Sequence, residues 1–303
     1  MVFDGYLLPT FYITEQSHSG GVSHIVCHDL CKNLDIPFDY SGYRQFRQET
    51  DKEGKPVYDT DGNPVYDQSK PIWYATSQII GNIASQCGFS ASSPAVSRMP
   101  KLCYNDFAEK SCRQILIDVS KAEVGHWVCS SDSGLSFVPF SHSSSGFEIA
   151  ENDRTEIELH GCKTISGIAA EDEISGEIFT SGSAWKNTER VSGRYLNAEI
   201  AGQITAQITG YEYRGWSCSN AVVSTLFNIG DFIAYNGNAL PVLNISCSFT
   251  ALGIVAQMSA PAADSSFSEY EDLYSRKIKG CAAYDRLLGC VSVTRQGIMI
   301  GGS

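Results

Sequence analysis

The sequence predicts a mainly β fold with interspersed helices (α+β), in which β-barrel-like modules are joined by a helix-plus-hairpin α/β segment. Three observations lead to this prediction. Short β-forming runs separated by Gly and Ser recur through residues 146 to 260. Residues 111 to 140 change from helical to strand-like spacing within one stretch. The chain is rich in Gly and Tyr (27 and 15 residues) and poor in Met (4 residues), which also favours β structure.

The segment from 111 to 140 is the most clearly patterned part of the chain. Four apolar residues lie on one face of a predicted helix, and Gly125 is expected to end that helix in a left-handed C′ conformation. Residues 126 to 129 and 135 to 138 are then predicted to form a β-hairpin around a Gly-containing turn. The helical positions are Ile115, Leu116, Val119 and Ala122. This unit would pack compactly, but it carries no chemistry of its own.

The N-terminal residues 1 to 14 are predicted to be extended. Because the chain begins directly in β-forming sequence, we expect either that these residues pair with strands from outside this segment or that the chain is a fragment of a longer one. A turn at 17 to 21 precedes a strand at 22 to 26, and residues 27 to 34 have helical spacing.

Four residues of this region form a His-x2-Cys-His-x2-Cys pattern that would suit zinc. They are His24, Cys27, His28 and Cys31. A strand followed by a helix would scatter these side chains, and no second pair of matching spacing exists. We therefore interpret them as core cysteines and polar-face histidines, and we expect no metal and no other cofactor.

Residues 49 to 70 contain an internal echo, GKPVYD followed by GNPVYD, around the turn sequence Asp59-Thr60-Asp61-Gly62. A calcium loop needs more oxygen ligands and a closing Glu, so an exposed polar hairpin insertion is predicted instead. Residues 71 to 89 are predicted to form a helix, and a Ser- and Pro-rich loop follows at 90 to 100.

The second half is predicted to be almost wholly β, although residues 219 to 226 are also compatible with a brief helix. The predicted strands cover residues 155–159, 164–169, 176–180, 198–201, 204–213, 226–233 and 243–256. Short strands at regular spacing favour a barrel or a sandwich.

We expect four parts. They are an N-terminal α/β portion (1–100) with the insertion at 49–70, a helix-plus-hairpin connector (101–145), a β-barrel-like domain (146–262) and a peripheral C-terminal tail (263–303).

The composition excludes some partners and favours one compartment. A formal net charge of −12, with no run of Lys or Arg, argues against binding to a nucleic-acid backbone. The 11 cysteines are odd in number and include no Cys-x-x-Cys, which favours buried free thiols and folding in a reducing cytosol. No apolar run approaches the length of a membrane span.

Residues suited to catalysis are present but poorly arranged. Cys129 lies near His126, but on a hairpin their side chains are not expected to meet. Glu171-Asp172-Glu173 could supply glycosidase carboxylates, yet a solvated turn is the simpler interpretation. Asp231 after Gly230 suits a turn better than a general base. We therefore expect no catalytic residue and no enzymatic activity.

Several aromatic residues could together line a sugar-binding face. They are Trp73, Trp185, Tyr211, Tyr213 and Trp216. Aromatic residues at strand spacing are more simply interpreted as core or interface residues.

Short motifs between residues 11 and 261 carry a family resemblance. An Arg-x-Ile-Leu helix, a Gly and a Leu-x-Phe hairpin end occupy Arg113 to Leu116, Gly125 and Leu135 to Phe137. The others are Ile165 to Ile168, Gly193-x-x-Leu196-Asn197, Gly230 to Ile233, Ser248 to Thr250, Ser259 to Pro261, and upstream Cys27 to Leu30 with Leu34-Asp35. With these motifs the chain resembles the tail-hub or baseplate-hub proteins of tailed bacteriophages and prophages. It looks most like those of siphophages of Gram-positive bacteria, whose fold is similar to the baseplate hub of contractile-tailed phages.

The resemblance implies a structural role in the virion tail, after synthesis in the cytoplasm of the bacterial host. Such hubs are homotrimeric rings that join the tail tube to the distal tip or receptor-binding device. The implied partners are further copies of the chain, distal tail or tail-tube proteins, and tip or receptor-binding proteins.

The chain departs from the family pattern in two places. The family usually has more sequence before residue 1, so the N-terminal domain is expected to be incomplete. A Pro often follows the Asn matched by Asn197, where Ala198 stands here.

The alternative functions are a tail-associated carbohydrate-binding module and a fragment of a cell-wall hydrolase.

Overall fold

The structure, a computed structural model, describes most of the chain up to residue 260. The described residues are 2–3, 6–7, 12–19, 22–28, 30–91, 96–129, 134–140, 147–151, 154–183, 188–223, 231–250 and 253–260. This part is mainly β with interspersed helices, which confirms the predicted fold class. The predicted tail at 263–303, Trp185 and the first part of the strand predicted at 226–233 lie outside the described residues.

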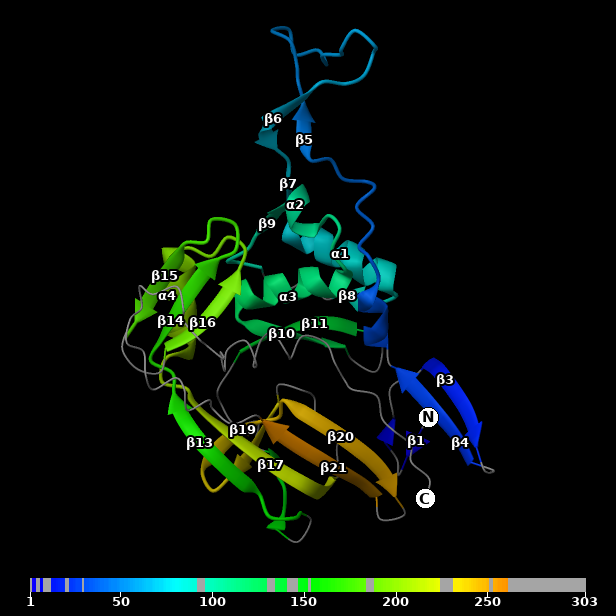
Figure 1. The fold of residues 1–303 in the computed structure, drawn as a ribbon, viewed down its shortest axis with the longest axis vertical. Helices are drawn as coiled ribbons and strands as arrows, with labels where there is room; N and C mark the ends of the chain where they lie inside the picture. Colours follow the sequence, from blue (N-terminus) through cyan, green and yellow to red (C-terminus); the bar gives the residue numbers. More distant parts are fainter. Residues whose placement is uncertain are drawn as a thin grey trace.

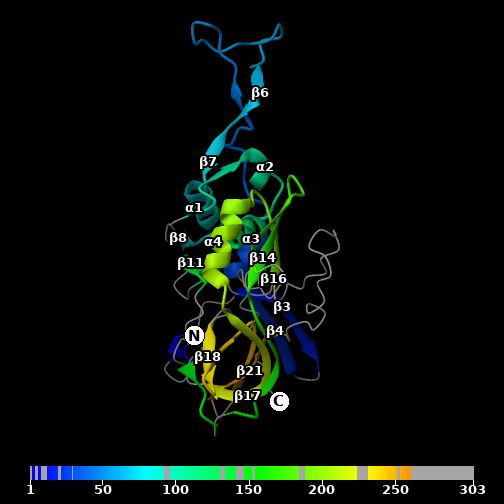
Figure 2. The same ribbon diagram turned by 90° about the vertical axis from the view of Figure 1, so that its left-hand side faces the viewer.

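The molecule is elongated, with most of its helices in the upper half of Figure 1 and its longest strands in the lower half. A two-stranded arm, residues 46–71, projects beyond the helices in both Figure 1 and Figure 2. Its strands are β5 (Phe46–Gln48) and β6 (Tyr66–Pro71). The N-terminal strands are β1 (Val2–Phe3), β2 (Tyr6–Leu7), β3 (Tyr12–Ser19) and β4 (Val22–His28).

The upper half is built on two helices, α1 (Thr76–Cys87) and α3 (Cys112–Glu123), which bury their apolar faces in one core. A hairpin of β10 (Gly125–Cys129) and β11 (Gly134–Pro139) lies beneath them, and β11 also pairs with β8. The remaining elements are η1 (Leu30–Asp35), β7 (Trp73–Ala75), β8 (Ser90–Ala91), β9 (Lys101–Cys103) and α2 (Tyr104–Phe107).

The predicted helix and hairpin at 111 to 140 are confirmed. Ser111 caps α3 by accepting a hydrogen bond from the Gln114 amide (3.2 Å), while the Gln114 side chain accepts one from the Ser111 amide (2.9 Å). Ile115 and Leu116 are fully buried, and the Trp127 indole N–H donates to the Leu116 carbonyl at 2.9 Å. The helix and the hairpin are thus joined through their shared core.

Gly125 has a different role from the predicted one. The left-handed residue that ends α3 is Val124, with φ of 57°, and Gly125 is already the first residue of β10. A Cβ at position 125 would overlap the Phe137 ring and the Val138 carbonyl oxygen of the paired strand. Gly125 is therefore required by close strand packing and not by its own backbone angle.

The lower half has two sheets around a second core. The larger sheet has the order β13-β17-β21-β20 and the smaller one β12-β18-β19. These strands are β12 (Phe147–Glu148), β13 (Glu158–Thr164), β17 (Glu212–Val223), β18 (Phe232–Tyr235), β19 (Asn238–Pro241), β20 (Asn244–Thr250) and β21 (Gly253–Ala260). Because the described strands fall into separate sheets, the barrel stays a prediction.

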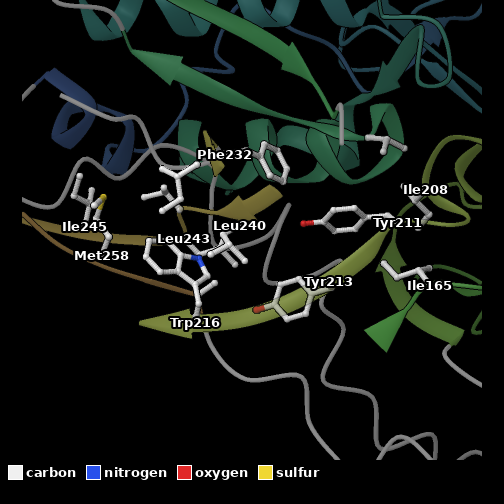
Figure 3. Packing of buried hydrophobic residues seen from close by; sticks show 14 of the residues in the cluster. Ile165, Ile208, Tyr211, Tyr213, Trp216, Phe232, Leu240, Leu243, Ile245 and Met258 are labelled. Carbon is white, nitrogen blue, oxygen red and sulfur yellow. The ribbon is translucent and has the colours of Figure 1, made fainter. Parts of the chain in front are cut away.

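Trp216 belongs to this second core and lies near Leu240, Leu243 and Tyr213 in Figure 3. Its side chain is fully buried, and its indole N–H donates to the Pro241 carbonyl at 2.7 Å. Tyr213 and Leu240 are likewise inaccessible to solvent. Each such side chain contributes roughly 1.5–3 kcal/mol through burial alone.

A third sheet lies beside the upper core (Figure 1) and has the order β15-β14-β16, with helix α4 beside it. Its strands are β14 (Gly167–Asp172), β15 (Ile178–Gly182) and β16 (Thr188–Gly193), and α4 spans Ala198–Ile208. β14 pairs antiparallel with β15 and parallel with β16.

Helix α4 contradicts the strands predicted at 198–201 and 204–213. The apolar residues Ile200, Ile204 and Ile208 recur every four residues, which places them on one buried helical face. Asn197 decides the conformation, because its side chain caps the helix by accepting a hydrogen bond from the Ile200 amide at 2.9 Å. Ala198 is then the first helical residue, a position that also suits the Pro of the resembled family.

Other predicted boundaries were wrong as well. The helix predicted at 71–89 begins only at Thr76, because residues 73–75 form β7 and pair with β9. In place of a helix at 27–34, β4 continues to His28 and a 3-10 helix follows at Leu30–Asp35. Residues 219–223 belong to β17 and are not helical, and β16 and β19 were not predicted.

Candidate functional site

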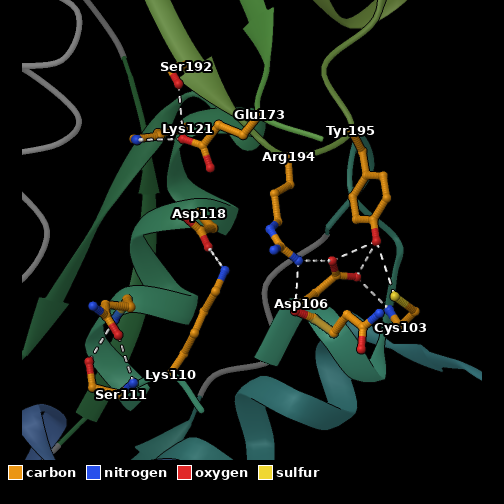
Figure 4. A network of polar contacts seen from close by, with 12 residues as sticks. Cys103, Asp106, Lys110, Ser111, Asp118, Lys121, Glu173, Ser192, Arg194 and Tyr195 are labelled. Atoms are coloured by element: carbon orange, nitrogen blue, oxygen red, sulfur yellow. Dashed lines mark hydrogen bonds and ion pairs between the residues drawn. The ribbon is translucent and has the colours of Figure 1, made fainter. Parts of the chain in front are cut away.

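A polar cluster joins the upper helices to the β14–β16 sheet (Figure 4). At its centre is Asp106 of α2, whose side chain is 2% exposed. Its carboxylate accepts hydrogen bonds from Arg194 Nη1 (2.8 Å), the Tyr195 hydroxyl (2.6 Å) and the Cys103 amide (2.6 Å). Arg194 also donates to the Asn105 carbonyl at 2.7 Å. Because Arg194 and Tyr195 follow β16, these bonds fix that sheet to α2.

The backbone of Tyr195 is held in an unusual conformation. Its φ is 63°, in the left-handed region that L-residues with a side chain rarely adopt. The Tyr195 amide donates to Asp172 Oδ1 at 2.7 Å, and Asp172 Oδ2 accepts from the amide (3.0 Å) and hydroxyl (2.8 Å) of Ser175. Surrounding contacts on both sides of the residue thus stabilise this conformation.

Burial and hydrogen bonding change the ionisation of these groups. Burial, reinforced by the hydrogen bond to Asp106, raises the pKa of the Tyr195 hydroxyl, so it remains a proton donor. Burial opposes ionisation of Asp172, but the hydrogen bonds from Ser175 and the Tyr195 amide outweigh it and lower the pKa of this carboxyl. At neutral pH the Tyr195 hydroxyl is therefore protonated and donates to Asp106, while the Asp172 carboxylate is ionised and accepts from the Tyr195 amide.

A second polar cluster connects the end of α3 to α4. The Glu123 carboxylate accepts from the amides of Arg98 and Met99, both at 2.7 Å. Arg98 donates in turn to the Glu123 carbonyl (2.6 Å), to Gln203 Oε1 (3.2 Å) and to Gln207 Oε1 (2.8 Å). One guanidinium thus bridges the loop before β9, the last residue of α3 and one face of α4.

A third contact lies where the lower sheet passes into the β14–β16 sheet. Lys163 of β13 and Glu189 of β16 form an ion pair at 2.5 Å, with side chains 7% and 0% exposed. Removing either partner would leave a buried charge uncompensated. The apolar residues of the β14–β16 sheet and α4 belong to the same core as those of the lower sheets, so the first two clusters join this core to the upper one.

The acidic run Glu171-Asp172-Glu173 takes part in these contacts: Glu171 and Asp172 end β14, and only Glu173 lies in the exposed turn that was predicted for the whole run. Glu171 pairs with Arg190, and Glu173 accepts from the Ser192 hydroxyl at 3.0 Å. Asp172 is 8% exposed and holds Tyr195 as described above. The three carboxylates therefore have separate structural partners and do not converge on a shared site.

The other residues considered for catalysis or metal binding are spread through the fold. His126 is 9% exposed, and burial lowers its pKa to about 4. Asp231 lies just before β18. Cys31 is buried in the upper core, while the side chains of His24, Cys27 and His28 lie outside the described residues. Among the described side chains, no group of three or more His, Cys, Asp or Glu is placed to hold a metal ion.

The four of these aromatic residues that the structure describes do not form an exposed sugar-binding face, and Trp185 lies outside the described residues. Tyr211, Tyr213 and Trp216 are all less than 5% exposed and belong to the lower core, whereas Trp73 is 46% exposed in the upper half. Among the described helices, none is long and apolar enough to cross a bilayer.

Sequence reasoning missed the residues that make the joints. No regular spacing in the sequence marks Asp106, Arg194 or Arg98. Their partners are also distant in the chain: Arg194 and Asp106 are 88 positions apart, and Arg98 and Gln203 are 105 positions apart. The only local signal was the acidic side chain at the third residue of α2, a helix-capping position.

Comparison with known proteins gives structural likenesses only. No protein-family model matches the chain, and no curated protein matches it. The chain is similar in fold to the 43 kDa tail protein of prophage MuSo2 from Shewanella oneidensis, with TM-score 0.49 and 11% identity over 85% of this chain and 77% of that one.

Two further solved structures are similar to the chain. A tail protein from Neisseria meningitidis MC58 has TM-score 0.45 and 11% identity, covering 84% of this chain and 80% of that one. The phage P2 baseplate in its activated conformation with Ca has TM-score 0.21 and 7% identity, covering 88% and 81%.

Proposed function

We propose that this chain is a structural, non-enzymatic component of a phage or prophage tail, placed at the tail tip or baseplate hub. Three copies form a ring that joins the tail tube to the distal tip or receptor-binding device. The chain is made in the cytoplasm of the bacterial host and is then incorporated into the virion. Residues 146–262 supply the hub domain, and residues 101–145 connect it to the N-terminal portion.

The observation that carries this proposal is the position of the motif residues in the fold. Arg113, from the Arg-x-Ile-Leu motif, pairs with Asp35 (2.5 Å) and donates to the Cys31 carbonyl (2.8 Å), which fastens α3 to η1. Leu135 is fully buried under α3, and Asn197 caps α4. The residues that resemble tail hubs are thus cores and joints, as expected if the family is defined by its architecture.

The use of charged side chains also supports a structural role. Asp106, Glu123 and Glu189 are buried and engaged with partners from distant segments. Buried ion pairs add little net stability over apolar contacts, but they penalise any arrangement in which a partner is misplaced. A ring component benefits from this property, because its subunits must present the same shape to each neighbour.

Immunogold labelling of assembled particles tests the placement in the tail. Antibodies raised against the purified chain are expected to label one end of the tail in electron micrographs. Particles that lack this chain while keeping complete, functional tails would refute the tail role.

Mass photometry of the purified chain tests the ring separately. We expect a species of three copies, which negative-stain images would show as a ring. A monomer that binds cell-wall glycans, or a band of clearing in a peptidoglycan zymogram, would instead favour the carbohydrate-binding or hydrolase alternative.

A further inference from the structure

The exposed aromatic side chains of this protein gather on the arm and at its base. Among the side chains that the structure describes, the exposed Trp, Tyr and Phe residues are Tyr58 (56%), Tyr66 (38%) and Trp73 (46%). Tyr58 and Tyr66 lie on the arm, and Trp73 of β7 follows two residues after its end. Because large aromatic residues are enriched at protein–protein interfaces, this distribution indicates that the arm is a contact surface.

The two tyrosines occupy the same place in the tandem repeat. Each is the Tyr of a Pro-Val-Tyr-Asp sequence, and the two turns are closed by equivalent backbone bonds. The Asp51 amide donates to the Lys55 carbonyl at 2.9 Å, and the Asp59 amide donates to the Asn63 carbonyl at 2.8 Å. These bonds order the backbone around the tyrosines before any partner binds, which reduces the entropy that binding would cost.

The base of the arm presents a face that could receive them. In the pairing of β7 with β9, Trp73 lies opposite Cys103 and Ala75 lies opposite Lys101. These four side chains share one face of the two strands, so Trp73 and Lys101 are diagonal neighbours. The ring of Trp73 packs against that of Tyr195, with centroids 5.7 Å apart, which gives the exposed indole a fixed support.

The tip and the base of the arm carry opposite charge. Between residues 49 and 61 acidic residues outnumber lysines: Glu49, Asp51, Glu53, Asp59 and Asp61 against Lys52 and Lys55. At the base, Arg44 and Lys101 are exposed, and neither forms an ion pair within the part of the chain that the structure describes. An acidic tip therefore complements the base of another copy, whereas two tips would repel each other.

We propose that the arm is a subunit clasp, in which the tip of one copy binds the face around Trp73 and Lys101 in a neighbouring copy of this chain. The inference rests on the proposed function and deepens it, because it names a contact that holds the ring together. The arm points away from its own body in Figures 1 and 2, which leaves the tip available to a second copy.

The clasp has the geometry that a ring requires. Tip and base are different surfaces, so the contact is head-to-tail, and a head-to-tail contact forms a ring when the rotation between copies closes. Tyr58 and Tyr66 supply the aromatic contact with Trp73. The surrounding charges set the orientation of one copy on the next.

Mass photometry of the full chain at decreasing concentrations tests the clasp. We expect a three-copy species for the native chain, and dissociation of the double variant Tyr58→Ser/Tyr66→Ser at concentrations at least about tenfold higher, because two interface aromatics are lost. The double variant Tyr58→Phe/Tyr66→Phe keeps the rings and should stay associated. Neither tyrosine is buried in the single chain, so an unchanged circular dichroism spectrum would show that both variants are folded.

Charge reversal tests the head-to-tail pairing. Lys101→Glu at the base and Asp61→Lys at the tip should each weaken association about two- to fivefold, because each places like charges across the contact. Asp61 contributes its backbone amide to the turn, and that bond is kept in the variant. A chain that carries both changes has opposite charges across the contact again, so it should associate more tightly than either single variant.

The outcomes separate the clasp from the ring itself. A serine variant that keeps the native ring at every dilution would overturn the clasp while leaving the three-copy ring in place, and the arm would then be available to a different tail protein. Charge variants whose effects add instead of compensating would also overturn it. A native chain that is monomeric at every concentration would remove the ring and the clasp together.

Discussion

The body and the arm of this molecule are ordered by different means. The body buries apolar side chains in two cores and fastens its parts with buried charges such as Asp106 and Glu189. All residues of the arm, 46–71, are described and none is buried. The arm therefore cannot owe its shape to a hydrophobic core.

Backbone hydrogen bonds link three segments of the arm to one another. The Glu49 amide donates to the Val65 carbonyl (2.8 Å), Val65 to the Val57 carbonyl (3.1 Å), and Val57 to the Glu49 carbonyl (2.9 Å). The tandem repeat explains this arrangement, because residues 51–58 and 59–66 form the same turn. Each turn has a Gly with φ of 81°, at Gly54 and Gly62.

An aspartate carboxylate stabilises each of these turns. Asp51 Oδ1 accepts from the Glu53 and Lys55 amides, and Asp59 Oδ1 accepts from the amides two and four residues later, all at 2.8–2.9 Å. Global stability therefore resides in the body, whereas hydrogen bonds between near neighbours hold the shape of the arm.

The largest effect is expected from Asp106→Ala in the body. This change leaves Arg194 and the Tyr195 hydroxyl without their buried acceptor, which costs about 3–5 kcal/mol of unfolding free energy. Urea denaturation followed by fluorescence measures it. The matched control is Glu53→Ala in the arm, whose ion pair with Lys55 is more than 70% exposed and should leave the unfolding midpoint unchanged. Equal midpoints for both variants would contradict the division into body and arm.

Acidification is expected to weaken the body next. Burial lowers the pKa of His126 to about 4, whereas in the unfolded chain it is about 6.5. Between these values the unfolded state binds a proton that the folded state does not, so stability is lost as pH falls from 6.5 to 4. The loss is on the order of 3 kcal/mol.

Denaturation across this pH range, compared with His126→Gln, isolates the histidine. The variant should have a flatter pH dependence between 6.5 and 4. The lowered carboxyl pKa values of Asp35 and Asp172 act mainly below this window and are shared by both proteins. Parallel curves for the two proteins would mean that His126 is not held neutral by burial.

Gly125→Ala should have an intermediate effect. Its new Cβ would overlap the Phe137 ring and the Val138 carbonyl, and separating β10 from β11 costs about 1–3 kcal/mol. Thermal unfolding measures the change. Gly42→Ala is a suitable control, because a Cβ there meets no atom within 4 Å and φ is not positive. A variant as stable as the native chain would show that the hairpin has room for the methyl group.

The smallest global effect is expected from Asp59→Ala in the arm. The second turn loses the carboxylate that accepts from the Asp61 and Asn63 amides, so hydrogen exchange at these two amides should quicken. The melting temperature should not change, since no buried contact is lost. A lowered melting temperature would show that the arm and the body unfold together.

Local sequence was sufficient where side-chain periodicity and capping agreed. The helix at 111 to 123 has apolar residues on one face and a capping box from Ser111 and Gln114, so both its type and its position could be predicted. At 198 to 208 the same reasoning failed. Apolar residues four positions apart lie on one face of a strand as well as on one face of a helix, so the isoleucines there did not distinguish the two structures. Asn197 was a capping signal that could have resolved the ambiguity.

The β-rich class, the helix-plus-hairpin segment and the turns of the arm could be predicted from sequence, because they depend on contacts between near neighbours. The pairing of Asp106 with Arg194, the bridge from α3 to α4 through Arg98, and the ion pair of Lys163 with Glu189 became known only from the folded chain. Charged residues carry no periodic signal of their own. Their partners are set by which surfaces are brought together when the apolar faces are buried, and that burial involves the whole chain.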